Sequence, residues 1–143
     1  LYIVYKKKLL VLNLNIKNFM NIKILFLKYL FYFSLFFLFI IYLLPGNLIE
    51  FNEGTVKEKT LLEGSIKHFY YFSYLTTIGL FVYIKEDKFY ALILLLLFLS
   101  LTIEFLHLFI PLREFSYYDV LANVLGYLFG LLLITFIKKY ITK

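Results

Sequence analysis

The chain carries several polar and charged residues inside or beside long apolar stretches. Glu104 and His107 lie three positions apart in one such stretch, a spacing that puts both side chains on the same face of a helix. Ionisable groups are costly at membrane depth and mostly face a cavity or a partner. These residue types can bind ligands or transfer protons, and six are predicted to form a binding site: His68, Glu104, His107, Arg113, Asp119 and Asn123.

Glu104 is the most deeply placed acid of this set. It precedes Ile110, the predicted end of its apolar run, by six residues, which is about 9 Å along a helix. An ordinary interfacial carboxylate would not lie so deep. Two interpretations follow: Glu104 pairs with a cation such as Arg113 and only orders the helices, or it belongs to a functional pocket.

A second polar stripe lies on the last apolar run. Asp119, Asn123, Gly126 and Gly130 fall within about 60° of one another on a helix. Two glycines four apart let another helix approach closely, so Gly126 and Gly130 are predicted to serve helix packing. Ser116 could also cap this helix, with Asp119 completing a capping box, which is a purely structural role for that acid.

Composition places these residues in a membrane protein. Of the 143 residues, 63% are hydrophobic and 22% aromatic, and the mean hydropathy is +0.87. A soluble domain is about 45–50% apolar, so the excess is expected to face lipid. The net charge of +6 arises from basic residues that flank apolar runs, and nucleic acid is therefore not an expected partner. The absence of Cys excludes disulfides and thiolate chemistry.

Four apolar runs are each close to the roughly 17–25 residues that a spanning helix needs. The predicted fold class is therefore all-α, an integral membrane four-helix bundle that forms a single domain over residues 20–143. Residues 1–19 are predicted to be a mis-annotated or disordered extension, because the only Met is Met20. The predicted spans are Ile24–Leu44, His68–Ile84, Phe89–Ile110 and Val120–Ile137.

The distribution of Lys and Arg predicts the orientation. The termini and the middle loop share one side and carry 11 basic residues, against 4 on the other side. Both termini are therefore predicted to be cytoplasmic, with the loops Pro45–Lys67 and Pro111–Asp119 outside. The six candidate binding residues then fall in one outer layer. The 11 are Lys6, Lys7, Lys8, Lys17, Lys23, Lys28, Lys85, Lys88, Lys138, Lys139 and Lys143, and the 4 are Lys57, Lys59, Lys67 and Arg113.

The segment from Glu104 to Gly130 resembles the signature of the VanZ-like family. That signature is an acid, a Gln three residues later, Pro-x-Arg, Ser, Asp, Asn and two Gly four apart. Lys67-His68-Phe69 resembles, more loosely, the Lys-x-x-His-Phe element at the start of the family's second span. His107 replaces the usual Gln and adds a group that can titrate near neutral pH. The matching positions are Glu104, His107, Pro111, Arg113, Ser116, Asp119, Asn123, Gly126 and Gly130.

This resemblance implies a multi-pass cell-envelope protein of the bacterial cytoplasmic membrane. The family's named member is associated with low-level resistance to the glycopeptide antibiotic teicoplanin. On this basis the expected ligand of the outer pocket is a lipid headgroup, a cell-wall precursor or a glycopeptide-related molecule. Arg113 would suit a phosphate or carboxylate of that ligand, because a guanidinium pairs with either through two hydrogen bonds.

Two other functions stay open at this stage. One is a membrane enzyme that acts on a lipid-linked substrate, with Glu104, His68 or His107 as acid and base. The other is a small transporter, which the absence of an internal repeat disfavours. No nucleophile motif is recognised, so the catalytic residues stay unknown. No metal or cofactor is predicted, since a metal site at Glu104 would need His68 and His107 to converge.

Overall fold

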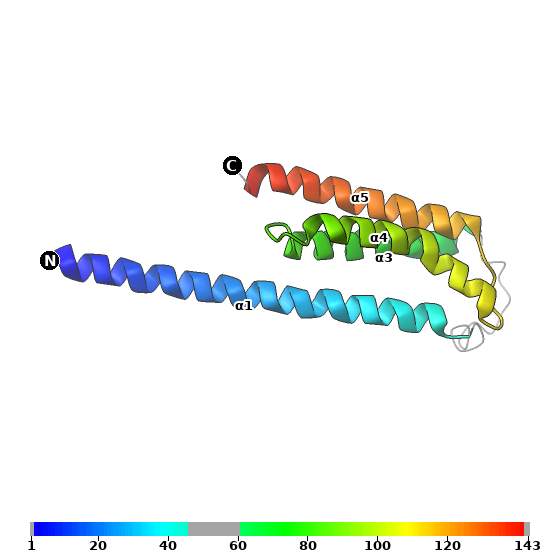
Figure 1. The fold of residues 1–143 in the computed structure, drawn as a ribbon, viewed down its shortest axis with the longest axis horizontal. Coiled ribbons are helices and arrows are strands. Elements are labelled where there is room, and N and C mark those ends of the chain that lie inside the picture. The colour runs from blue at the N-terminus through cyan, green and yellow to red at the C-terminus, as the bar shows by residue number, and fades with distance from the viewer. Residues whose placement is uncertain (1, 46–60, 142–143) are drawn as a thin grey trace.

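The structure, a computed structural model, describes residues 2–45 and 61–141, with side chains at 5–6, 19–45 and 64–140. Its described part is helical, which confirms the all-α class. The helices are α1 (Tyr2–Leu43), α3 (Leu61–Val82), α4 (Phe89–Thr102) and α5 (Tyr117–Ile141), and a 3-10 helix, η1 (Ile103–Phe109), continues α4 (Figure 1). Most of the loop Pro45–Lys67, predicted to face outward, lies outside the described residues.

Two helices begin earlier than the apolar runs indicate. α1 begins at Tyr2, because its 42 residues contain neither Pro nor Gly to break it. It therefore continues through residues 2–19, and the limits of the predicted domain stay a prediction. α3 begins at Leu61, seven residues before His68, because Ser65 and Lys67 are compatible with a helix that extends beyond its apolar part.

Helices α3, α4 and α5 lie alongside one another, and α1 runs along them and extends past their ends at its own N-terminus (Figure 1). The most extensive contact is between α3 and α5. Small residues permit it: a Cβ built on Gly126 would lie 2.3 Å from the backbone oxygen of Phe69, and one on Gly130 would lie 2.8 Å from that of Ser73. The two glycines thus face α3 at backbone contact distance.

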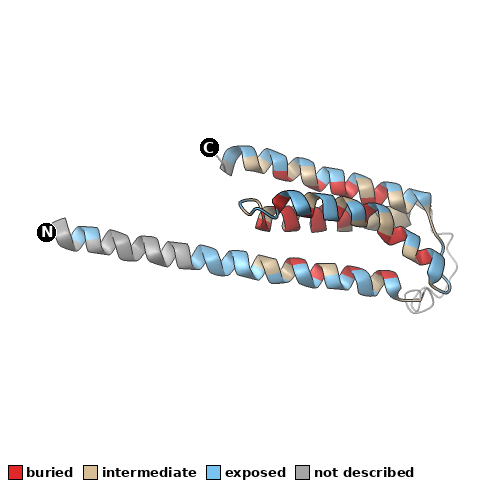
Figure 2. Ribbon diagram, in the orientation of Figure 1, coloured by how far each residue is buried: buried red, intermediate tan, exposed pale blue. Residues whose placement is uncertain are grey.

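Burial divides the residues into a small core and a wide exposed exterior (Figure 2). The core includes Phe31, Phe72, Leu75, Leu96 and Ile134. The exterior carries many large apolar side chains, which water would solvate poorly and lipid would solvate well. Among those that are exposed are Phe26, Phe33, Phe36, Tyr90, Leu94, Phe98, Leu132 and Phe136.

Within the part of the chain that the structure describes, three helical segments are long and apolar enough to cross a bilayer: Phe19–Leu43, Phe89–Phe109 and Tyr117–Tyr140. The predicted first, third and fourth spans correspond to them. α3, at 22 residues, is as long as a span but is not among these three segments, and its crossing stays a prediction. The chain is in this sense a candidate multi-pass membrane protein by helix length and hydropathy.

Charged residues mark the end of the bundle at the turn between α3 and α4. Lys28 of α1 donates a hydrogen bond of 2.6 Å to Glu86 in that turn. Lys138 of α5 lies 4.1 Å from the ring centroid of Phe89, the first residue of α4. Lys28, which interrupts the first apolar run, thus lies at the end of the bundle. From there to Leu44 the helix rises about 24 Å, close to the roughly 30 Å of a hydrocarbon core.

Candidate functional site

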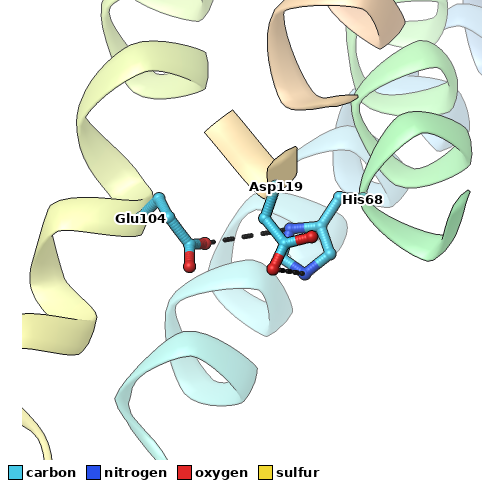
Figure 3. A group of neighbouring side chains, drawn as sticks. All are labelled: His68, Glu104 and Asp119. Carbon is cyan, nitrogen blue, oxygen red and sulfur yellow. Dashed lines mark ion pairs between the residues drawn. The ribbon is translucent and has the colours of Figure 1, made fainter. Parts of the chain in front are cut away.

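Most of the predicted site residues gather at the other end of the bundle. His68 lies in the second turn of α3, Glu104 in η1 and Asp119 in the first turn of α5, and their side chains point toward one another (Figure 3). The imidazole lies between the two acids: Nδ1 is 3.9 Å from Glu104 Oε2, and Nε2 is 3.9 Å from Asp119 Oδ2. Residues from three separate elements thus form one cluster.

The side chains of Glu104 and His107 lie on the same side of a helix because the helix changes type before them. The sequence predicts one continuous α-helix from Phe89 to Ile110, whereas the structure changes to a 3-10 helix at Ile103. In a 3-10 helix the residues i and i+3 are eclipsed, and seven residues is long for this type. Glu104 Oε1 and His107 Nδ1 are 2.8 Å apart, and both side chains are buried, at 0% and 5% exposure.

Tyr42, near the end of α1, completes the site, and sequence reasoning missed it. Its hydroxyl is 2.5 Å from His68 Nδ1 and 3.4 Å from Asn123 Oδ1. Its ring stacks on the His107 ring, with centroids 5.1 Å apart and planes 18° apart. A chain with 14 Tyr and 18 Phe offers no signal that singles out this Tyr.

The first turns of α5 supply Asp119 and Asn123. Asp119 Oδ1 accepts a hydrogen bond of 2.6 Å from the hydroxyl of Ser65 on α3, a second residue that sequence reasoning missed. Asn123 is fully buried, and its Oδ1 is 3.2 Å from His68 Nδ1. Both side chains therefore contact α3.

Asp119 was also predicted to form a capping box with Ser116, and the contacts at the start of α5 bear on that interpretation. α5 begins directly after Ser116, whose carbonyl accepts hydrogen bonds from the backbone N–H groups of Asp119 and Val120. A capping box would require the Asp119 carboxylate to accept a hydrogen bond from the backbone N–H of Ser116. The carboxylate is engaged by Ser65 and lies near His68 instead.

The pairing of Glu104 with Arg113, one of the two interpretations of this acid, is not the arrangement that the described residues show. The guanidinium donates from Nε to the carbonyl of Leu44 at 3.2 Å and from Nη2 to that of Ile41 at 2.9 Å. The last carbonyls of a helix have no partner within the helix, and a nearby Arg can satisfy them. Arg113 therefore ties the end of α1 to the loop before α5, and Glu104 finds its partners in the two histidines.

A tight turn aims Arg113 at α1. Its backbone N–H donates to the carbonyl of Ile110 at 3.3 Å, with Pro111 and Leu112 as the central residues. Leu112 has a φ of 60°, the conformation that a type II turn requires at this position and that normally selects Gly. An exposed Leu here is strained, and such strain is common at functional sites.

Arg113→Ala should lower the free energy of unfolding by about 2 kcal/mol, because two hydrogen bonds from a charged donor to carbonyls are lost. Unfolding in mixed micelles of detergent and SDS, followed by circular dichroism, measures the change. Glu114→Ala, which alters an exposed neighbour, is the control. A loss of ligand binding in a fully stable Arg113→Ala protein would instead make Arg113 a ligand-binding residue.

Three polar atoms at the site are buried and have no hydrogen-bond partner in the described part of the chain. They are Glu104 Oε2, His107 Nε2 and Asn123 Nδ2. A buried polar group without a partner is costly, and each such group calls for a water, an ion or a ligand. With two carboxylates and two imidazoles, the site is suited to bind a cation or hydrogen-bond donors and to transfer protons.

No protein-family model, no curated protein and no solved structure matches the chain. The resemblance to the VanZ-like family therefore stays a prediction. The geometry of the site provides the observations on which a function can be proposed.

Proposed function

We propose that the chain is a VanZ-like membrane protein that crosses the bilayer four times and binds the polar headgroup of a lipid-linked envelope molecule. The observation that carries this proposal is the cluster of His68, Asp119 and the fully buried Glu104 at one end of a bundle with an apolar exterior. Buried charges are expensive, and in membrane proteins such groups commonly mark a substrate or ion site.

The crossing of α3 follows from its neighbours. α3 lies along α5, whose length and apolar composition suit a membrane span. It has 22 residues, which corresponds to about 33 Å, and a short turn over residues 83–88 joins it to α4. A helix held between spanning helices over that length has no room to lie on the surface. We therefore place α3 across the membrane as the second span.

The orientation follows from the two ends of the bundle. Lysines crowd the end with the α3–α4 turn, where Lys28, Lys85, Lys88, Lys138 and Lys139 lie. By the positive-inside rule that end faces the cytoplasm. The site with His68, Glu104 and Asp119 then faces outward, as a receptor for envelope components requires.

The charge of the site limits the chemistry of its ligand. The guanidinium of Arg113 already donates to α1 carbonyls, which removes the group first expected to bind a phosphate. The remaining carboxylates and amide favour hydroxyl and amino groups, which the sugars of lipid-linked cell-wall precursors and of glycopeptides carry. Side-chain exposures of 19% for both His68 and Asp119 leave the cluster accessible from one side.

A second candidate function, a membrane enzyme, rests on the pair Glu104 and His107. Their hydrogen bond of 2.8 Å joins two groups that can exchange a proton, and Glu104 Oε2 beside it has no partner. General acid–base catalysis needs such a pair within reach of the substrate. Turnover of a lipid-linked substrate by wild-type protein, lost in His107→Gln, would favour this candidate.

Native mass spectrometry of the protein, extracted from its membrane with mild detergent, tests the proposed function. The wild-type protein should carry a lipid-linked sugar that dissociates on activation. Asp119→Asn should carry at least about tenfold less, since a charged hydrogen-bond acceptor is worth about 1.5–3 kcal/mol. Glu114→Gln is the matched control, because Glu114 is exposed near the same end. Equal lipid on the wild type and Asp119→Asn would contradict the proposal.

A further inference from the structure

Three possible metal ligands converge at the site from three elements of the chain. His68, Glu104 and Asp119 each offer one donor atom, and these three atoms all lie within 4.8 Å of one another (Figure 3). Donor atoms around a tetrahedral ion at about 2.1 Å are about 3.4 Å apart. A contraction of an ångström or so, within the reach of side-chain rotations, would bring the three into coordination.

A second observation points into the same space. Glu104 is fully buried, and its Oε2, which is directed at His68, has no hydrogen-bond partner among the described residues. Its other oxygen is held by His107 at 2.8 Å. A buried carboxylate with one oxygen free and directed at an imidazole is stabilised by a positive charge placed between the two groups.

We propose that His68, Glu104 and Asp119 bind a divalent transition-metal ion, for which Zn²⁺ is the best fit. One imidazole with two carboxylates is a donor set that Zn²⁺ accepts, whereas Mg²⁺ prefers six oxygens and retains its waters. The sequence alone predicted no metal, because the donor set considered there, Glu104 with two histidines, required His68 and His107 to converge.

The surroundings of the three residues resemble the outer shell of a metal site. A metal-binding imidazole commonly donates its other N–H to an oxygen, which fixes the ring. His68 Nδ1 is 3.2 Å from Asn123 Oδ1 and 2.5 Å from the hydroxyl of Tyr42. Nε2, which lies 3.9 Å from Asp119 Oδ2, is therefore the nitrogen that we assign to the ion. Glu104 Oε2, which faces Nδ1 at 3.9 Å, must rotate about its side-chain bonds to reach an ion held there. Ser65 and His107 hold the two carboxylates in the same way.

Three protein ligands leave the fourth position of a tetrahedral ion open, as in metal sites that bind substrates. An ion there would give an otherwise acidic site affinity for a phosphate or carboxylate. This deepens the proposed function, because the phosphate of a lipid-linked molecule could then bind beside its sugar. The metal site itself does not depend on that ligand.

The test uses the purified full chain in detergent, freed of metal with a chelator and titrated with Zn²⁺ alone. The wild-type protein should bind one Zn²⁺ per chain and gain thermal stability. Glu104→Gln, Asp119→Asn and His68→Gln should each lower the affinity by more than about 100-fold, whereas His107→Gln, an outer-shell change, should lower it by about 10-fold. Glu114→Gln, an exposed acid, should bind like the wild type.

Wild-type protein that binds neither Zn²⁺ nor Mn²⁺ would overturn the proposal. Wild-type affinity in Glu104→Gln and Asp119→Asn would overturn it as well, and so would equal affinity for Mg²⁺. Should all three variants fail to fold, the visible absorption of Co²⁺ added to the wild type decides between tetrahedral coordination and no site. Zn²⁺ binding without any bound lipid would refute the proposed function and leave the metal site standing.

Discussion

Glu104→Ala is expected to lower the free energy of unfolding by about 3–5 kcal/mol, because it removes one partner of a buried pair and leaves His107 without it. Glu104→Gln should cost about 1–2 kcal/mol, since the amide can still hydrogen-bond His107 Nδ1. Unfolding in mixed micelles, compared at neutral pH, measures both changes.

Comparing the stability changes of Glu104→Ala and Glu104→Gln shows which property of the Glu104 side chain stabilises the protein. If the carboxylate were only an interfacial group, both substitutions would change the stability by less than about 0.5 kcal/mol. If the charge itself were needed for folding, Glu104→Gln would cost as much as Glu104→Ala. Glu86→Gln, in the partly exposed pair with Lys28 at the other end of the bundle, is the matched control and should cost less than about 1 kcal/mol.

Gly126→Ala is expected to destabilise the bundle by about 3 kcal/mol, because the new Cβ would meet the backbone oxygen of Phe69 at 2.3 Å. A backbone atom within a helix cannot move aside as a side chain can, so α3 and α5 must separate. The separation would also move His68 away from Asp119. The free energy of unfolding in mixed micelles measures the first effect, and Zn²⁺ or lipid binding by the folded fraction measures the second.

Gly64→Ala provides the control for Gly126→Ala. Gly64 also lies in a helix, but nothing is within 4 Å of a Cβ built on it. This substitution should therefore stabilise the protein by up to about 1 kcal/mol through helix propensity alone. Equal effects of the two substitutions would mean that α3 and α5 do not approach at Gly126.

Much of the fold is predictable from hydropathy, because long apolar runs are a direct consequence of the thickness of the bilayer. Pro45 and Pro111 delimit the first and third runs, and the helices end near them. The start of α1 is not predictable in this way, since the segment before the first apolar run contains no Pro or Gly that would mark a helix boundary. The change from α-helix to 3-10 helix is also not predictable, because no residue around Ile103 favours a 3-10 turn over an α-helical one.

The sequence predicts which residues belong to the candidate site better than it predicts which residues contact one another. Depth and spacing within apolar runs single out Glu104, His107, Asp119 and Asn123, because polar groups are rare there. Partners across helices depend on how the helices rotate against one another, which one sequence does not reveal. This explains why Tyr42 and Ser65 were missed. It also explains the wrong partner for Arg113, whose loop reaches the end of α1 rather than the acids.

The most direct test of the central claim, that the polar cluster lies at the outer face of a four-span bundle, is labelling of single cysteines in intact cells. The chain contains no Cys, so each introduced thiol reports alone. The positions are Lys67 in the second turn of α3, Asp87 in the α3–α4 turn and Glu114 before α5, all exposed. A membrane-impermeant maleimide should label Cys at positions 67 and 114 in intact cells, and Cys at position 87 only after permeabilisation. Labelling at position 87 from outside, or of positions 67 and 114 from opposite sides, would contradict the account.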